Sequence, residues 1–411
     1  MKILHVLSAF DVDFPGGITN YLRTLAASQV ASGDDVFVVD GGESRVWRKH
    51  QLGFSVVGAD STQGDHFTVS MRRHPVAARG LVAFIAGQAP DIVHFHLTSG
   101  IGVDFYSEFI ELHVPFVVSL HDYFLFCPRI TMVDYSGDNC GGPSSEKCSR
   151  CIGVIDQVDV LFRLSRKTGL PLPRMRSSKL DRRNEQIGNF LGSAALVLAV
   201  STRVREIYES VYPHANYAVS RIGSSSADIA RPRKTASDKI RLTFIGTLAK
   251  FKGSEILERI AVGLTRDDIS IEFFGRLGHP KAGKKLVEAG VAVRGSYEPS
   301  DLPRIMSNTD IGLVLPIWED NAPQVVMEFL NYGVPVVATS MGGIPDFVGS
   351  ENGFLFDPRS DDGVASAINF IESLDASEVR AWGKSLPRLP GPDRHQAEIR
   401  GFYEHALVIP Q

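Results

Sequence analysis

The chain has 411 residues, of which 44% are hydrophobic and 22% charged, and its formal net charge is −4 at pH 7. This length is typical of two or three domains, and the composition is that of a globular protein. The acidic balance excludes a chain-wide binder of nucleic acid, so any attraction to phosphate or anionic lipid must come from local patches.

No apolar run of this sequence reaches the ~18 residues that a membrane helix needs. The first residues, Met1-Lys2 and the segment ILHVLSAF, lack the apolar region and the cleavage site of a signal peptide. We therefore expect a cytoplasmic protein, with peripheral contact at the inner face of the plasma membrane left open.

Short apolar segments alternate with helical patterns in the first half of the chain. Near-continuous apolar strands separated by helices are typical of a parallel sheet covered on both faces. We therefore expect a Rossmann-like, doubly wound N-terminal domain over residues 1–225. Its strands are expected at Lys2–Ala9, Asp34–Asp40, Asp91–Leu97, Pro115–Asp122 and Ala195–Ser201.

Two features of this half are suited to a ligand. Gly16 and Gly17 follow the first strand and open a helix, where glycines let a ligand approach the backbone amides closely. Such a pair is usually only a turn. His121 ends a buried strand, where a histidine is more often structural, and His94 and His96 are expected in the core or in a cleft wall.

All four cysteines of the chain lie within 25 residues, with the spacing C-x12-C-x7-C-x2-C: Cys127, Cys140, Cys148 and Cys151. Four thiolates can close a tetrahedral zinc site. An iron–sulfur cluster is an alternative, and reduced thiols, free or partly paired, are a third. Disulfides are less expected in a cytosolic chain. Residues 127–151 are interpreted as an insertion that a structural zinc ion would hold together.

The segment Leu161–Asn184 is strongly basic and contains one acid, Asp181. One interpretation is a solvated helical face. The other is a docking patch, over Arg163 to Arg183, for an anionic membrane or a phosphorylated acceptor. Its basic residues are Arg163, Arg166, Lys167, Arg174, Arg176, Lys179, Arg182 and Arg183.

A polar linker over residues 226–238 precedes a second series of apolar strands, which predicts a second Rossmann-like domain over residues 239–391. We expect residues 392–411 to form a helix that crosses back to the first domain, with Phe402 and Tyr403 as its contacts. The strands of the second domain are expected at Lys239–Thr247, Ile269–Gly275, Val291–Tyr297, Asp310–Ile317, Val334–Ser340 and Gly353–Asp357.

The loop Glu319–Pro323 of the second domain ends a strand, and a helix begins near Gln324. Asp320 and Glu328 are eight residues apart. Asp320 is at the entrance of that helix and Glu328 is about two turns into it, so the two lie on a similar face. Two acceptors so placed can hold hydroxyls at two points of an extended ligand. The alternative is that Asp320 or Asn321 caps the helix and that Glu328 is a surface residue.

This region resembles the signature of glycosyltransferase family four, a retaining family with the two-domain GT-B fold. The matching residues are Asp320-x7-Glu328, GVPVVAT at 333–339 and GGIPD at 342–346. The resemblance implies that Asp320 contacts donor-sugar hydroxyls and that Glu328 contacts the nucleotide ribose. It places Asn321, Ala322, Pro323 and Gln324 along the donor. The family usually has Glu at the position of Asp320.

The segment FIGTLAKFKG at 244–253 is similar to the family's turn that holds the donor diphosphate. The resemblance assigns this role to Lys252, with Thr247 where the family usually has Arg. It places Gly16 and Gly17 against the donor phosphates, and His121 near the donor sugar as a hydrogen-bond donor. The run HDYxxxCP with later cysteines resembles a subgroup of the family.

The resemblance implies transfer of a sugar from a nucleoside-diphosphate sugar to an acceptor hydroxyl, with retention and without a catalytic metal. The expected acceptor is a glycan or a lipid-linked glycan, in the synthesis of surface polysaccharide. The catalytic residues expected are His121, Lys252 and Asp320. The departures at Thr247 and Asp320 keep open an alternative, a catalytically inactive GT-B scaffold that binds a glycan or a protein partner.

Overall fold

The computed structural model describes residues 1–42, 45–58, 73, 75–134, 137–152, 164, 168–170, 177–224, 226–278 and 280–408. These residues form two compact α/β units, one comprising Met1–Ile222 with Pro392–Gln411 and the other Gly223–Gly391. Each unit has its own sheet and its own core, so each is described by itself. None of the described helices is both long enough and apolar enough to span a membrane.

The sheet of the first unit has the strand order β3-β4-β2-β1-β5-β6-β7-β8, and its neighbours run parallel except for the short β3–β4 pair. The expected parallel sheet is confirmed, and β3, β4 and β8 are strands that the apolar pattern did not predict. The strands are β1 Lys2–Leu7, β2 Asp35–Asp40, β3 Arg48–Lys49, β4 Ser55–Gly58, β5 Ile92–Leu97, β6 Phe116–Leu120, β7 Leu196–Ala199 and β8 Tyr217–Val219.

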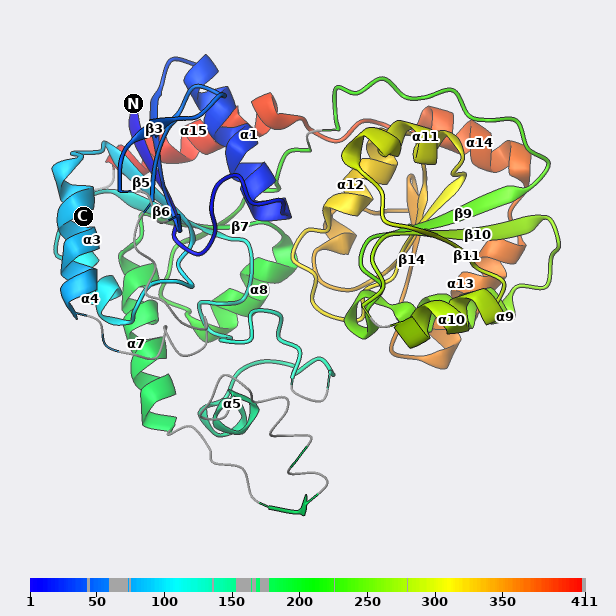
Figure 1. Ribbon diagram of the computed structural model, residues 1–411, viewed down its shortest axis with the longest axis horizontal. Coiled ribbons are helices and arrows are strands. Elements are labelled where there is room, and N and C mark those ends of the chain that lie inside the picture. The colour runs from blue at the N-terminus through cyan, green and yellow to red at the C-terminus, as the bar shows by residue number, and fades with distance from the viewer. Residues whose placement is uncertain are drawn as a thin grey trace. The chain divides into compact units, whose positions relative to one another are not determined.

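Helices cover both faces of this sheet, because right-handed crossovers to its two halves place them on opposite sides. Figure 1 shows α1 and α15 packed together on one face, and α3, α4 and α7 on the other. The helices are α1 Gly17–Ala31, α3 Pro75–Gly87, α4 Asp104–Ile110, α5 Ser145–Ile152, α7 Ser177–Ser193, α8 Thr202–Val211 and α15 Pro392–Val408.

The second unit holds an all-parallel sheet with the order β11-β10-β9-β12-β13-β14. Most residues of its central strands are buried, as expected of strands covered on both faces. The strands are β9 Ile240–Ile245, β10 Ile269–Phe274, β11 Ala292–Gly295, β12 Ile311–Val314, β13 Val336–Thr339 and β14 Gly353–Phe356.

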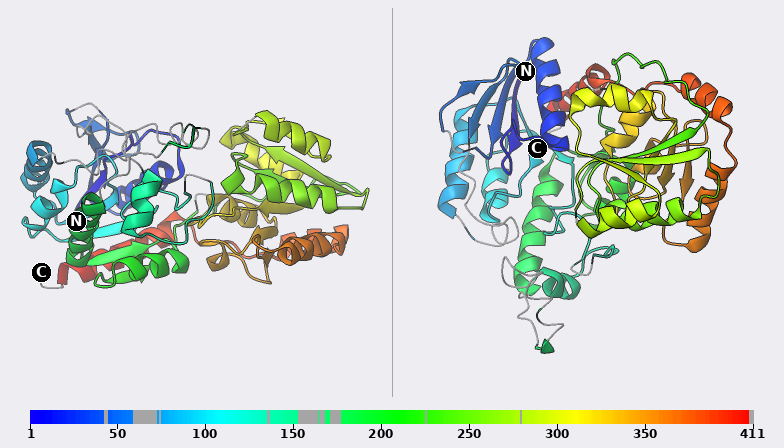
Figure 2. Two further views of the ribbon diagram at one scale, coloured as in Figure 1. Left: turned by 90° about the horizontal axis from the view of Figure 1, so that it is seen from below. Right: turned by 45° about the vertical axis from the view of Figure 1, so that its right-hand side comes forward.

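The helices of the second unit also form two layers, which the views in Figures 1 and 2 show on either side of its strands. Helices α9, α10 and α13 lie on one face, where α9 contacts both others, and α11, α12 and α14 lie on the other. The helices are α9 Ser254–Gly263, α10 Pro280–Glu288, α11 Leu302–Ser307, α12 Gln324–Asn331, α13 Asp361–Glu372 and α14 Ala376–Ser385.

Helix α15 returns the end of the chain to the first unit. It packs along α1, and its buried face includes Ile399 and Tyr403. The Tyr403 side chain is fully buried and its hydroxyl lies 2.6 Å from Nδ1 of His94 on β5. The first unit is therefore built from both ends of the chain.

Candidate functional site

The second sheet reverses its winding between β9 and β12, which are neighbours in the sheet although two strands and their helices separate them in the chain. Ligands of open α/β sheets bind outside the carboxyl ends of the strands at such a switch point. The loop after β9 contains Lys252, and the loop after β12 contains Asp320. The two segments selected in the sequence therefore meet at one edge of the sheet.

The turn that carries Lys252 is packed directly on the end of β12. Gly253 has φ 93°, and a β-carbon there would lie 1.9 Å from the carbonyl oxygen of Leu315. Only glycine fits this backbone conformation and this close approach. The amide of Ile317 also donates to the carbonyl oxygen of Phe251 at 2.9 Å. The position of Lys252 relative to the second loop is therefore set by the backbone.

Lys252 and Asp320 form an ion pair, with Nζ 2.6 Å from Oδ2. The ammonium also lies 4.9 Å from the ring centroid of Trp318, which is a cation–π distance. The Lys252 side chain keeps 35% of its surface exposed, against 11% for Asp320. The pair therefore holds the lysine in place while leaving it accessible to an anion.

The backbone around Asp320 is held by the glycine turn after β13. Gly343 donates its amide to the carbonyl oxygen of Asp320 at 2.7 Å. Gly342 has φ 55°, and a β-carbon there would lie 2.1 Å from that same oxygen. Helix α12 has Pro323 as its N-cap residue and no side-chain cap. Neither Asp320 nor Asn321 caps the helix, so the capping interpretation is wrong.

Two buried polar atoms beside the ion pair have no hydrogen-bond partner in the described part of the chain: Nδ2 of Asn321 and Nε1 of Trp318. Buried polar groups are nearly always satisfied, so unsatisfied ones need an explanation. Donors next to a partly exposed cation are suited to a polar ligand that accepts hydrogen bonds. The sequence predicted Asn321 here, but Trp318 was missed because a lone tryptophan after a strand is usually a packing residue.

Glu328 lies on α12, and its carboxyl has no hydrogen-bond partner among the described residues. Burial raises the pKa of Glu328 to about 7, although part of the residue still reaches the surface. The pKa of Tyr297 is raised to about 12, first by burial and then by the charge of Glu328. Tyr297, which follows β11, is therefore a neighbour that only the tertiary structure identifies.

The other predicted donor-binding residues differ in accessibility. Thr247 is exposed and Gln324 is partly exposed. Ala322 is also partly exposed, whereas Pro323 is buried. Thr247 follows Gly246, which has φ 129° and turns the chain directly after β9.

Gly16 and Gly17 lie where the segment after β1 enters α1 in the first unit. Gly16 is the N-cap residue of α1, in extended backbone with φ −169°, and Gly17 begins the helix. A β-carbon at Gly16 would lie no closer than 3.4 Å to any neighbour. The fold therefore does not demand glycine at position 16.

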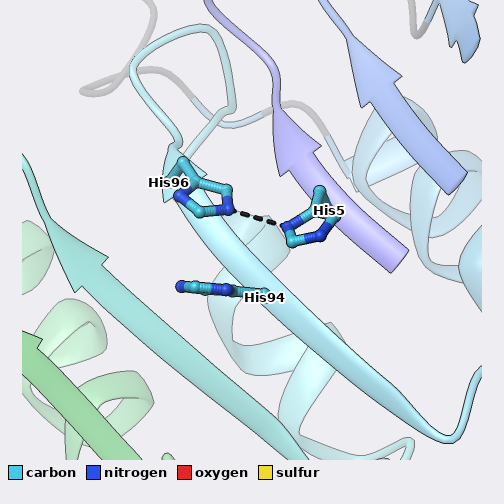
Figure 3. Close-up of side chains that lie close together, drawn as sticks. All are labelled: His5, His94 and His96. Atoms are coloured by element: carbon cyan, nitrogen blue, oxygen red, sulfur yellow. Dashed lines mark hydrogen bonds between the residues drawn. The ribbon is translucent and has the colours of Figure 1, made fainter. Parts of the chain in front are cut away.

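His121 directly follows β6, and behind it lies a group of buried histidines. His5 on β1 and His94 and His96 on β5 are at most 5% exposed, and their ligand atoms lie within 4.8 Å of one another (Figure 3). His94 and His96 were expected in the core or in a cleft wall, and both are buried. His5 was missed, although H-x-H on one buried strand facing a histidine on its neighbour is a readable signal.

The ring nitrogens of this histidine group already have partners. His5 lies 2.7 Å from Oε1 of Gln29 and 2.9 Å from His96. His94 lies 2.6 Å from the Tyr403 hydroxyl and 2.7 Å from that of Ser119. A metal ion would have to replace these bonds, so the geometry favours a hydrogen-bonded network.

The four cysteines line one hollow of about 390 Å³, with Cys148 and Cys151 on α5 and the other two on the preceding loop. Burial raises the pKa of Cys127 to about 12, so its thiol is protonated at neutral pH unless a metal ion displaces the proton. Within the described part of the chain, the histidines, and not these thiols, form a group with ligand atoms within 4.8 Å.

Much of the predicted basic patch lies outside the described residues, namely Arg163, Arg166, Lys167, Arg174 and Arg176. Lys179 and Arg182 are exposed on α7. The prediction that Arg183 belongs to the basic patch is wrong, because its side chain is buried, with 1% of the residue exposed, and donates to the carbonyl oxygens of Phe124 and Leu125. It lies on the inward face of α7, where it holds the loop after β6.

Known protein families match both units. A family model described as Glycosyltransferase Family 4 matches residues 15–222, about half of the chain. A second model, described as Glycosyl transferases group 1, matches residues 239–372, which include Lys252, Asp320 and Glu328. The chain belongs to glycosyltransferase family 4.

Curated relatives of this family 4 chain match it over part of its length. "Putative teichuronic acid biosynthesis glycosyltransferase TuaC" of Bacillus subtilis (strain 168) is 28% identical over 192 residues, which are 44% of this chain and 48% of the relative. "Sulfoquinovosyl transferase SQD2" of Arabidopsis thaliana is 29% identical over 148 residues, 34% of this chain and 28% of the relative. The matches thus span at most about half of these relatives.

Solved structures match the fold of the family 4 chain over nearly its whole length. HepE of Anabaena, solved in complex with UDP, has a TM-score of 0.63 and 16% identity, covering 98% of this chain and 100% of its own. Sucrose-phosphate synthase of Thermosynechococcus elongatus has a TM-score of 0.63 and 14% identity, covering 99% and 97%. These similarities confirm the GT-B fold.

Proposed function

We propose that this chain is a retaining glycosyltransferase that moves a sugar from a nucleoside-diphosphate sugar to an acceptor hydroxyl. The observation that carries the proposal is the Lys252–Asp320 pair at the switch point of the second sheet, beside the unsatisfied Nδ2 of Asn321. A cation, a carboxylate and a free donor match the diphosphate and hydroxyls of such a ligand. The solved structure of HepE with UDP, on the same fold, agrees with this choice.

The proposed chemistry requires the nucleoside diphosphate to leave with its negative charge stabilised. Lys252 is the proposed preorganised cation for this charge. Asp320 accepts from a sugar hydroxyl, and Glu328 accepts from the ribose. Thr247 offers one neutral hydrogen bond, whereas an arginine there would offer a charged, two-pronged contact.

Two variants test separately the proposed contacts to the diphosphate and to the sugar of the donor. In Lys252→Met, both the free nucleoside diphosphate and the sugar nucleotide should bind more weakly, by about tenfold or more, because a charge-assisted hydrogen bond contributes ~1.5–3 kcal/mol. In Asp320→Asn, only the sugar nucleotide should bind more weakly. Calorimetry would measure both affinities, with Lys284→Met on the exposed face of α10 as the control.

The donor is chosen by a thermal-shift screen of UDP-, GDP- and ADP-sugars, because a ligand that binds the folded state raises its melting temperature. Transfer is then assayed with the stabilising donor, and product NMR shows whether the anomeric configuration is retained. If no donor binds, or if Lys252→Met binds both ligands as tightly as wild type, the proposal is wrong. Donor binding without hydrolysis or transfer would favour the alternative, an inactive scaffold.

We also propose a glycan or lipid-linked acceptor and a place at the cytoplasmic face of the membrane. The relation to a chain named for teichuronic acid biosynthesis supports an acceptor of the surface-polysaccharide class. Lys179 and Arg182 are exposed and can add to attraction toward anionic lipid. Sedimentation with vesicles of anionic and of neutral lipid tests this, since only the anionic vesicles should bind.

A third part of the proposal is a structural zinc ion held by Cys127, Cys140, Cys148 and Cys151. The four thiols are of the type that zinc prefers, and they surround one hollow. When bound, zinc would keep the thiols deprotonated and tie α5 to the preceding loop. An iron–sulfur cluster and free thiols remain the other outcomes of a metal measurement.

A further inference from the structure

A continuous chain of hydrogen bonds leads from helix α1 to His121. Oε1 of Gln29 lies 2.7 Å from Nε2 of His5. Nδ1 of His5 lies 2.9 Å from Nε2 of His96, the contact drawn in Figure 3. Nδ1 of His96 lies 3.1 Å from Nε2 of His121. The chain crosses β1 and β5 and ends at the carboxyl end of β6.

Each imidazole in this chain carries a single ring proton at neutral pH. Burial lowers the pKa of His5 to about 4 and that of His121 to about 3, and burial lowers the pKa of His96 well below its ordinary value. A neutral imidazole donates from one nitrogen and accepts at the other. Two facing nitrogens share one proton, so the tautomer of each histidine decides that of the next.

Gln29 determines the direction of the chain. Its Nε2 donates to the Tyr403 hydroxyl at 3.3 Å, so its carbonyl oxygen faces His5. An oxygen of this kind only accepts, and Nε2 of His5 must therefore carry the proton. The same logic puts the protons of His96 and His121 on Nε2. A flipped Gln29 amide would reverse the direction of every hydrogen bond in the chain at once. The chain of hydrogen bonds therefore has only two possible directions, or polarities.

The chain of hydrogen bonds ends at His121, where one ring nitrogen is left over. Nε2 of His121 is used by His96, and Nδ1 has no partner among the described residues. This nitrogen is also not among the buried atoms that lack a partner, so it reaches solvent. In the polarity set by Gln29, the exposed nitrogen carries a lone pair.

We propose that Gln29, His5 and His96 are positioning residues that hold His121 as the Nε2–H tautomer and present its Nδ1 as an acceptor for a sugar hydroxyl. The inference rests on the proposed function for the sugar. It reverses the direction of hydrogen bonding expected for His121. A buried polar network with no further role would satisfy its members equally well in either polarity. The chain of hydrogen bonds from Gln29 to His121, which we call the relay, requires the polarity set by Gln29.

Nitrogen-15 NMR of histidine-labelled, full-length protein reads each tautomer directly from long-range proton–nitrogen couplings. The wild type should show His5, His96 and His121 as Nε2–H forms at neutral pH. In Gln29→Met, His5 would be left with a buried N–H that lacks an acceptor, so the chain should reverse and His121 should become the Nδ1–H form. Gln29→Glu keeps an acceptor and should keep the wild-type pattern.

Activity gives the second readout. Gln29→Met should lower kcat by about tenfold, the loss expected for one hydrogen bond to the reacting sugar, and Gln29→Glu should restore most of it. Gln396→Met is the control, since Gln396 is a buried glutamine of the same unit outside the chain of hydrogen bonds. The control should retain both the tautomers and the activity.

Failure of the relay and failure of the proposed function are distinguishable. An Nδ1–H form of His121 in the wild type, or an unchanged His121 in a folded Gln29→Met protein, overturns the relay whatever the enzyme does. The predicted tautomers in a protein that binds no sugar nucleotide overturn the proposed function, and with it the sugar hydroxyl as the partner of Nδ1.

Discussion

The carboxyl of Glu328 is buried and has no hydrogen-bond partner among the residues that the structure describes, and this combination opposes its charged form. Its pKa is raised from 4.5 to about 7 by burial. A carboxylate kept without a partner destabilises the free protein but is ready to accept hydroxyls. At this residue, stability and ligand binding are expected to conflict.

We predict that Glu328→Gln becomes more stable than wild type as the pH rises. The unfolded carboxyl loses its proton near pH 4.5 and the folded one near pH 7. Between these values the folded state binds more protons, so wild-type stability falls as pH rises through this window. The gain of the variant should approach at most about 3 kcal/mol above pH 7, at ~1.4 kcal/mol per pKa unit.

Urea unfolding at pH 5 and pH 8 measures this difference, which should be small at pH 5. Glu288→Gln is the control, because Glu288 is exposed on α10 and pairs with Lys284. The same variant should bind the sugar nucleotide more weakly than wild type. An equal stability difference at both pH values would contradict the assignment of the titration to Glu328.

At the scale of elements, Arg183 connects α7 to the loop that follows His121. Its guanidinium donates to the carbonyl oxygens of Phe124 and Leu125 and lies 4.8 Å from the ring centroid of Phe124. The hydroxyl of Tyr212 on the segment after α8 donates to the same Leu125 oxygen at 2.9 Å. One buried cation thus satisfies backbone groups that no strand or helix pairs.

We predict that Arg183→Met lowers the free energy of unfolding of the first unit by about 2–4 kcal/mol, because buried carbonyl oxygens lose a charged donor. Arg182→Met, one residue earlier and exposed, should have almost no effect. Chemical denaturation of both variants measures this. Equal effects would show that the arginine acts through surface charge and not through the loop.

The segment from Cys127 to α5 contains little buried apolar surface, which is why a metal ion would matter there. We predict about one zinc per chain in protein purified without chelators, and loss of the metal in Cys148→Ser. Plasma emission spectrometry and thiol titration measure this. Four titratable thiols without bound metal would exclude the zinc site, and iron with acid-labile sulfide would indicate an iron–sulfur cluster. Ser145→Ala, on the same helix, is a control that leaves the thiols intact.

At the scale of the whole molecule, the chain leaves the first unit at Ile222, builds the second, and returns as α15. Helix α15 buries Ile399 and Tyr403 against the first unit. The stability of the first unit therefore depends on a helix that follows the second unit in the sequence, and the second unit is formed by one continuous segment.

We predict that Tyr403→Phe destabilises the first unit alone, by about 1–2 kcal/mol, because His94 loses the hydroxyl 2.6 Å from its Nδ1. Hydrogen–deuterium exchange resolved by peptide measures this. Exchange should rise in β1, β5 and α15, while the peptides of Gly223–Gly391 serve as the internal control. A uniform rise in both units would contradict the separation.

The sequence by itself determined the two parallel α/β units, the loops that carry Lys252 and Asp320, and the helix that carries Glu328. Apolar strands and glycine turns are local patterns, and the parallel sheet follows from their alternation. The strands predicted from these patterns are confirmed, as is the family. The family signature is also local, since it lies within residues 320–346.

Only the tertiary structure decided which polar side chains meet. His5 and His96 are 91 residues apart, and Gln29 and Tyr403 are 374 apart. Their contacts depend on which strands pair and on where the last helix docks, and no local pattern encodes a partner at that distance. Arg183 was assigned to the surface for the same reason, because the carbonyl oxygens that bury it belong to a distant loop.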